Sequence, residues 1–158
     1  MNQTLSTILK NTYSLSQLRH RLNVFKSQLL QNFFGEIRIE PQAADLAWLK
    51  SLPSDFISSF NKDNVYHIFE DLDKEIKSIK TLIIYLTFEP DETSLAQIGD
   101  YARKTFNNSE LILEIKYDPH LIAGAALSWN GLYKDYSLRA KIEERKSAIL
   151  ESFKKFLR

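Results

Sequence analysis

The first part of the chain carries hydrophobic residues at the three- and four-residue spacing of a helix face. They follow one another at intervals of 3, 4, 3 and 4 residues, and they are Leu15, Leu18, Leu22, Phe25 and Leu29. This pattern places them along one side of a helix, so residues 1–33 are predicted to form one or two helices. The stripe has two interpretations: it packs in the protein's own core, or it is a heptad seam that pairs with a partner helix.

Three further helices are predicted before residue 80. A brief extended piece at residues 37–39 precedes them. Pro41 suits the first turn of a helix that ends at the next proline, and Ser54 or Asp55 can cap a short successor. Asp63 is expected to cap the third helix, because apolar residues again recur at helical spacing as far as residue 80.

The pattern changes at Thr81, where residues 81–88 are β-branched and apolar with almost no polar break. Such a run is typical of a strand buried on both faces. Helical spacing then returns, and Asp91 or Thr93 can cap a helix to about residue 106. Residues 110–117 alternate in character, which indicates a second strand with one wetter face. Strand, helix and strand form a βαβ unit, whose crossover should be right-handed.

Turn residues divide the remainder of the chain. Asp118 and Pro119 turn it, and residues 121–129 can return as a third strand. Asn130 and Gly131 indicate a hairpin, because a type I′ turn requires positive φ at both central positions. A short strand at 132–134 follows. One helix is then expected over residues 137–157, with apolar residues along one side.

The shift in composition near residue 80 predicts two domains, a helical one over residues 1–80 and an α/β one over residues 81–158. The predicted fold class is α+β, in which the helical part precedes a small βαββ(β)α domain with a mixed sheet. The chain has 158 residues, of which 44% are hydrophobic and 26% charged. These proportions are sufficient for a buried core.

Charge and composition narrow the classes of function. The net charge of +1 argues against a dedicated nucleic-acid-binding protein. The absence of cysteine excludes disulfides and cysteine-ligated metals. The N-terminus lacks the pattern of a signal peptide, and no window reaches the run of about 18 apolar residues that a membrane span needs. We therefore expect a cytoplasmic protein with no direct insertion into the membrane.

No group of residues predicts catalysis. His20, His67 and His120 lie far apart and lack metal-ligand spacing. The carboxylates at 70–75 and 143–144 are interleaved with basic residues, as on solvated helix faces. The glycines form no phosphate loop, and Gly-x-Ser-x-Gly is absent. We therefore predict no catalytic residue, no metal, no cofactor and no small-molecule ligand. An enzyme whose pocket forms only in three dimensions is a further alternative.

The last motifs are unremarkable singly but specific in their order. Alone, Asp118 and Pro119 are a turn, and Asp135 or Ser137 is a helix cap worth roughly 1 kcal/mol. Together they read Asp-Pro-x-Leu-Ile-x-Gly, a hairpin, then Asp-x-Ser-aliphatic-x-x-basic-aliphatic. This order resembles the C-terminal signature of the delta subunit of F-type ATP synthases, a family that includes the mitochondrial oligomycin-sensitivity-conferring protein. The matching residues are Asp118, Pro119, Leu121, Ile122, Gly124, Asp135, Ser137, Leu138, Lys141 and Ile142.

The resemblance covers roughly residues 81–150, whereas the N-terminal half diverges from the family pattern. It implies a non-catalytic subunit of the peripheral stalk that links the catalytic head to the b-type stalk subunit. The alpha subunits are a second implied partner, and the implied location is peripheral, on the inner face of the cell membrane, through the complex. The alternative is an unrelated helical adaptor or scaffold that pairs through the heptad seam.

A stalk subunit needs a durable interface, and exposed aromatic side chains often dominate such interfaces. The candidate contacts lie on the last helix and around the hairpin, and they are Trp129, Tyr133, Ile149, Phe153 and Phe156. For Trp129, packing in the domain's own core is an equal alternative.

Overall fold

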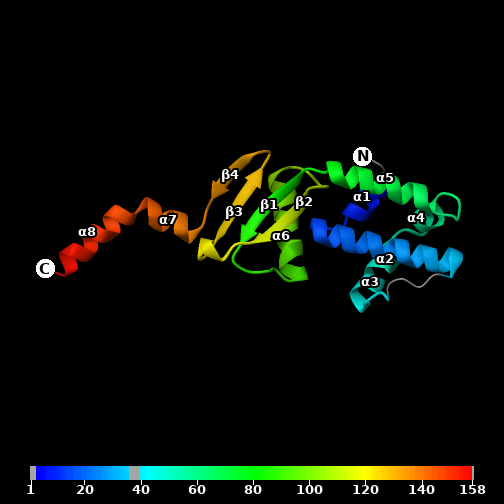
Figure 1. The fold of residues 1–158 in the computed structure, drawn as a ribbon, viewed down its shortest axis with the longest axis horizontal. Coiled ribbons are helices and arrows are strands. Elements are labelled where there is room, and N and C mark those ends of the chain that lie inside the picture. The colour runs from blue at the N-terminus through cyan, green and yellow to red at the C-terminus, as the bar shows by residue number, and fades with distance from the viewer. Residues whose placement is uncertain (1–2, 36–39, 158) are drawn as a thin grey trace.

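A four-stranded sheet lies between two groups of helices in the computed structural model, which describes residues 3–35 and 40–157 (Figure 1). The N-terminal helices lie at one end of an elongated molecule, and the last two helices extend from the other end. The extended piece predicted at residues 37–39 lies outside the described residues. The α+β class with a mixed sheet is confirmed.

The N-terminal part consists of helices, as predicted. They are α1 (Gln3–Leu9), α2 (Leu15–Phe34), α3 (Ala43–Ser51), α4 (Ser54–Ser58) and α5 (Val65–Ser78). Ser14 begins α2, because its side chain accepts a hydrogen bond from the backbone N–H of Gln17, and Gly35 ends it in the left-handed conformation. Asp63 is not the cap of α5. Instead, the side chain of Asn61 accepts hydrogen bonds from the backbone N–H groups of Asp63 and Asn64.

The apolar stripe of α2 packs inside the N-terminal part. Leu18, Leu22, Phe25 and Leu29 are all buried in a single cluster with residues of the other N-terminal helices. Phe25 is central to this cluster, with its ring centroid 5.1–6.4 Å from those of four aromatic neighbours, which are Trp48, Phe56, Phe60 and Phe69. The first interpretation, in which the stripe packs in the protein's own core, is therefore right. Its four buried side chains are not accessible to a partner helix.

The sheet contains β1 (Thr81–Leu86), β2 (Ile112–Tyr117), β3 (Ala125–Trp129) and β4 (Leu132–Asp135) in the order β2-β1-β3-β4. β1 pairs in parallel with β2 and antiparallel with β3, and β3 pairs antiparallel with β4. Helix α6 (Glu92–Thr105) connects β1 to β2 and packs on the apolar face. Asp91 caps it, since its side chain accepts from the N–H of Ser94.

β1 is buried on one face only, which corrects the prediction of two buried faces. Leu82, Ile84 and Leu86 are buried, whereas the residues between them are half-buried. The second face carries Tyr85 beside Tyr133 rather than a closed apolar layer. For β2 the predicted alternation between a dry and a wetter face is wrong. Both faces are buried at its start and both are exposed at its end, so burial changes along the strand.

Two further predictions about length were wrong. The third strand begins at Ala125 rather than 121, because a 3-10 helix, η1 (Pro119–Leu121), and the positive φ angles of Ile122 and Gly124 interrupt the extended chain. The last helix is broken at Arg145, which has φ −102° and ψ 10°, into α7 (Leu138–Glu144) and α8 (Lys146–Phe156). The hairpin turn is confirmed, with positive φ at both Asn130 and Gly131.

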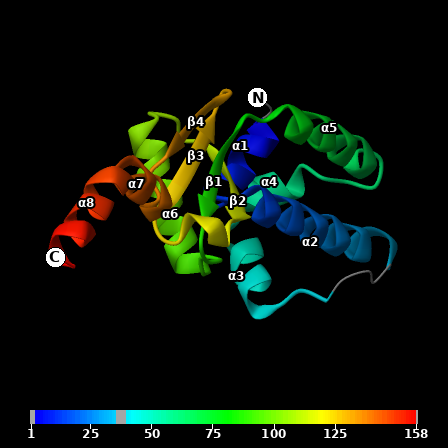
Figure 2. The ribbon, with the colours of Figure 1, turned by 60° about the vertical axis from the view of Figure 1, so that its left-hand side comes forward.

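Most of the buried apolar residues belong to two clusters. One lies among α1–α5 and includes Ile112 of β2, and the other lies between the sheet and α6. These clusters support, as a proposal, the division into domains 1–80 and 81–158. Neither cluster includes a residue of α7 or α8, and Figure 2 shows α8 standing away from the sheet and the N-terminal helices.

Candidate interaction site

The start of α7 is built from both predicted cap residues. The Oγ of Ser137 accepts from the backbone N–H of Ala140 at 3.2 Å. Asp135 accepts from the N–H of Ser137 at 2.8 Å and from the Arg139 guanidinium at 3.0 Å. The hydrogen bonds from Ser137 are the main cause of the lowered pKa of Asp135. The hydrogen bond and ion pair with Asp135 raise the pKa of the Arg139 guanidinium. Each cap residue therefore has its own backbone group to satisfy.

Gly124 allows the start of α7 to lie directly against the chain that leads into β3. Its φ of +86° belongs to the left-handed region, and a Cβ here would lie 2.9 Å from the carbonyl oxygen of Tyr136. Backbone hydrogen bonds from Tyr136 to Ala125 and from Leu138 to Ala123 hold the two segments together. The glycine of the motif is therefore required by both conformation and space.

The turn at Asp118 connects the same region to β1. The side chain of Asp118 accepts from the N–H of His120, and its own N–H donates to the carbonyl of Leu86 at 2.8 Å. Leu121 is fully buried, whereas Ile122 is exposed. Lys141 lies further along α7 and is also exposed. Most of the predicted motif residues thus meet near the start of α7, where their observed contacts are structural.

Gly124→Ala is expected to destabilise the protein by about 2 kcal/mol, because a left-handed backbone disfavours a Cβ and the added atom meets Tyr136. Urea denaturation followed by circular dichroism would measure the change. Gly131→Ala is the matched control, since Gly131 also has positive φ but no atom within 4 Å of its Cβ position. Equal losses in the two variants would contradict close packing at Gly124.

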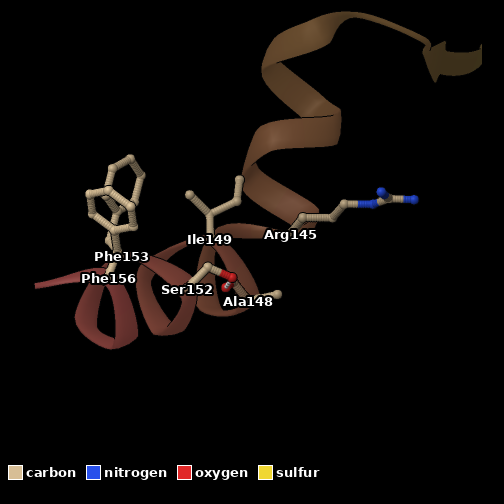
Figure 3. Close-up of a pocket in the computed structure, with 6 residues that line it drawn as sticks. All are labelled: Arg145, Ala148, Ile149, Ser152, Phe153 and Phe156. Atoms are coloured by element: carbon tan, nitrogen blue, oxygen red, sulfur yellow. Dashed lines mark hydrogen bonds between the residues drawn. The ribbon is translucent and has the colours of Figure 1, made fainter. Parts of the chain in front are cut away.

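α8 presents three of the predicted contact residues on one side. Ile149, Phe153 and Phe156 project from the same face of the helix (Figure 3). Phe153 is 62% exposed and Phe156 is 89% exposed. No residue of α8 is buried. A helix with an apolar stripe usually buries that stripe against another element. This stripe of Ile149, Phe153 and Phe156, called the α8 stripe below, has no such element in the described chain.

A second apolar surface is a groove of about 600 Å³ between α6 and the strands β3 and β4. Trp129 lines it and packs on Phe106, with ring centroids 5.4 Å apart. Tyr101 and Tyr136 also line it. Sequence reasoning did not identify these neighbours of Trp129, because they come from segments that only the fold brings together. None of the described residues lining the groove is a carboxylate, so the converging carboxylates of a hidden active site are not found there.

The structure separates the predicted contact residues into three places. Trp129 lies at the groove, half-buried against the domain's own core. Tyr133 lies on the opposite face of the sheet, with its ring 6.0 Å from that of Tyr85. The α8 stripe lies beyond the sheet. The residues of the hairpin therefore do not form one surface, because neighbours on a strand alternate between its faces.

Two of the three histidines each contact one acidic side chain. His20 contacts Asp45 across α2 and α3 at 2.9 Å, and His67 contacts Asp71 within α5. Within residues 3–35 and 40–157, no cluster of three or more histidine or acidic side chains could hold a metal ion. Over the same ranges, no helix combines the length and the apolar character needed to cross a membrane.

The fold and its surfaces are those of a small α+β protein that carries apolar surface without a partner in the described chain. The family model for the ATP synthase delta (OSCP) subunit matches residues 61–149, which is more than half of the chain. The chain belongs to this family, whose members are non-catalytic components of the peripheral stalk of F-type ATP synthase.

One relative extends the similarity into the N-terminal part. The ATP synthase subunit delta of Leptospira interrogans serogroup Icterohaemorrhagiae serovar copenhageni (strain Fiocruz L1-130) is 26% identical over 144 residues. The alignment covers 81% of this chain and 76% of the relative. A match of this extent includes much of the helical part, which the C-terminal motif alone does not reach.

Proposed function

We propose that this chain joins the b-type stalk subunit to the catalytic head of an F-type ATP synthase. The α8 stripe is the observation that carries this proposal, because it is an apolar helix face with no partner in the described chain. A stalk subunit that is itself helical would bury the stripe as one helix packs against another. The location that follows is peripheral, on the inner face of the cell membrane, through the complex.

The proposed contact with the stalk consists of the α8 stripe and the groove beside Trp129. Both surfaces are largely apolar, as the centres of durable interfaces are. Tyr133 is proposed as a separate contact, because it faces the other side of the sheet. The structural residues at the start of α7 support this interface indirectly, since they set the direction in which α7 and α8 leave the sheet.

The N-terminal helices are proposed to face the alpha subunits of the head. Phe34 at the end of α2 and Tyr66 at the start of α5 are exposed aromatic residues with ring centroids 6.0 Å apart. The end of α2 and the start of α5 lie at the end of the molecule opposite α8 (Figure 1). A link between two bodies requires contact surfaces at separate places, and these two ends provide them.

Purification from the native cell tests the proposal. A tagged copy of the chain is expected to recover the b-type stalk subunit together with the alpha subunits. Recovery of no ATP synthase subunit would overturn the proposed function. An excess of the untagged chain is the control, because it should compete for the same partners and reduce the yield.

A further inference from the structure

We propose that Arg103 is a positioning residue that fixes the angle between the helical part, α1–α5, and the sheet, so that the chain acts as one stiff link. The inference concerns the chain itself, and only its purpose in the stalk rests on the proposed function. Arg103 lies on α6, but its contacts reach mainly across to the N-terminal part.

The Arg103 guanidinium collects carbonyl groups from the end of α1 and the loop that follows. Nη2 donates to the carbonyls of Leu9 at 2.9 Å and Thr12 at 2.6 Å, and Nη1 donates to that of Lys10 at 3.2 Å. Nε donates to the carbonyl of Leu111, just before β2. The last carbonyls of a helix lack partners within the helix and carry partial negative charge. The Arg103 guanidinium thus supplies hydrogen-bond donors to carbonyls at and just after the end of α1, and it shares the Leu9 carbonyl with the N–H of Thr12.

Tyr13 completes the contact on the other side of the guanidinium. Its ring centroid lies 4.7 Å from the Cζ of Arg103, within the range of a cation–π interaction. The ring also covers Gly99 on α6, where an added Cβ would lie only 2.3 Å from Cδ1 of Tyr13. A glycine in the middle of a helix is unfavourable by about 1 kcal/mol, so it often marks a close approach of this kind.

The loop before α2 is paired with the sheet as well. The N–H of Leu113 donates to the carbonyl of Tyr13 at 2.8 Å, and Ser14 forms a parallel bridge with Leu113. Ser6 of α1 donates to the carboxylate of Glu110 at 2.6 Å. These contacts lie at the β2 edge of the sheet, which faces the N-terminal helices, and they are close to Arg103.

Two attachments therefore join the parts. The first is covalent, through the two residues between α5 and β1, and alone it would leave rotation free about its backbone bonds. The second is the set of contacts around Arg103 and Tyr13, which come from distant parts of the sequence and lie beside Ile112 of β2, itself buried in the cluster of the helical part. Two separate points of attachment exclude that rotation, and Arg103 has the largest number of polar contacts at the second point.

Spin labels on the two parts measure the angle directly. The chain contains no cysteine, so Asp73→Cys on α5 and Gln97→Cys on α6 provide one pair of exposed labelling sites. Double electron–electron resonance on the full chain is expected to give a narrow distance distribution. Arg103→Ala should broaden it while the helical circular dichroism is retained. Lys104→Ala, an exposed neighbour on the same helix, is the matched control and should leave it narrow.

Gly99→Ala is the second variant, and it remains informative if Arg103→Ala does not fold. It should also broaden the distribution by displacing Tyr13, although alanine favours a helix more than glycine does. An unchanged distribution in the folded variants would overturn the inference. Loss of helical circular dichroism in both variants would also overturn it, because the contacts would then hold α1 itself rather than the angle.

The same variant separates this inference from the proposed function. In an assembled ATP synthase, Arg103→Ala should reduce proton pumping per ATP hydrolysed, because a less rigid link lets the head follow the rotor. If Arg103→Ala broadens the distance distribution but the tagged parent chain recovers no ATP synthase subunit, the role of Arg103 stands and the role in the stalk is refuted. If the distribution of Arg103→Ala stays narrow and the parent chain does recover these subunits, the role in the stalk stands and the role of Arg103 is refuted.

Discussion

Serine in place of both Phe153 and Phe156 is expected to weaken binding of the b-type stalk subunit at least a hundredfold. Central aromatic residues of an interface contribute about 2 kcal/mol or more each, and about 1.4 kcal/mol corresponds to a tenfold change in affinity. Thermal stability should not fall, because both side chains are mostly exposed in the free chain. Titration calorimetry of the full chain with the stalk subunit would measure the affinity.

The matched control is Phe88→Ser. Phe88 follows β1, is 52% exposed and lies outside α8 and the groove. We expect it to leave both affinity and stability unchanged. If the double serine variant binds as tightly as the parent chain, the α8 stripe is not the stalk contact. The groove would then be examined in the same way through Trp129→Ala.

Phe25→Ala is expected to lower the free energy of unfolding by about 3–5 kcal/mol, the usual range for removing a buried phenylalanine. Phe25 is 2% exposed and contacts aromatic rings from α3, α4 and α5. Its removal leaves a cavity that these rings cannot all move to fill. A loss of this size is a large fraction of the stability of a typical domain. Urea denaturation followed by circular dichroism would measure it.

Phe34→Ala is the control on the same helix, since Phe34 is 44% exposed and should contribute less than about 1 kcal/mol. The comparison also checks by experiment that the α2 stripe packs in the core. A variant at Phe25 that keeps its stability but loses a partner would show that the stripe is a docking surface. The burial of Leu18, Leu22 and Leu29 around it predicts the opposite.

Local features of the sequence predicted most of the elements. The spacing in α2 and α5 and the apolar run of β1 depend on neighbouring residues only, so their pattern is visible without a fold. The hairpin at Asn130 and Gly131 was predicted because positive φ restricts the residue types allowed there. The break at Arg145 was missed, because no proline or glycine marks it and the apolar spacing continues through it.

Local features of the sequence also predicted part of the candidate site, namely the turn, hairpin and cap residues. The order of turn, hairpin and cap identified the family, and the structure gives these residues their contacts around Gly124 and Ser137. The grouping of the aromatic residues was not predictable. Trp129 and Tyr133 are close in sequence but face opposite sides of the sheet, and the partners of Trp129 on α6 come from a distant segment.

The sequence by itself determined the elements, the α+β class and the family, because periodicity, turn chemistry and motif order are properties of residues close along the chain. Only the tertiary structure decided that the α2 stripe is core, that the α8 stripe has no partner in the described chain, and that Arg103 holds the end of α1. Those outcomes depend on which distant segments pack together. That packing determines burial and long-range hydrogen bonds. The hydrophobic pattern along the sequence does not show which distant segments will pack together.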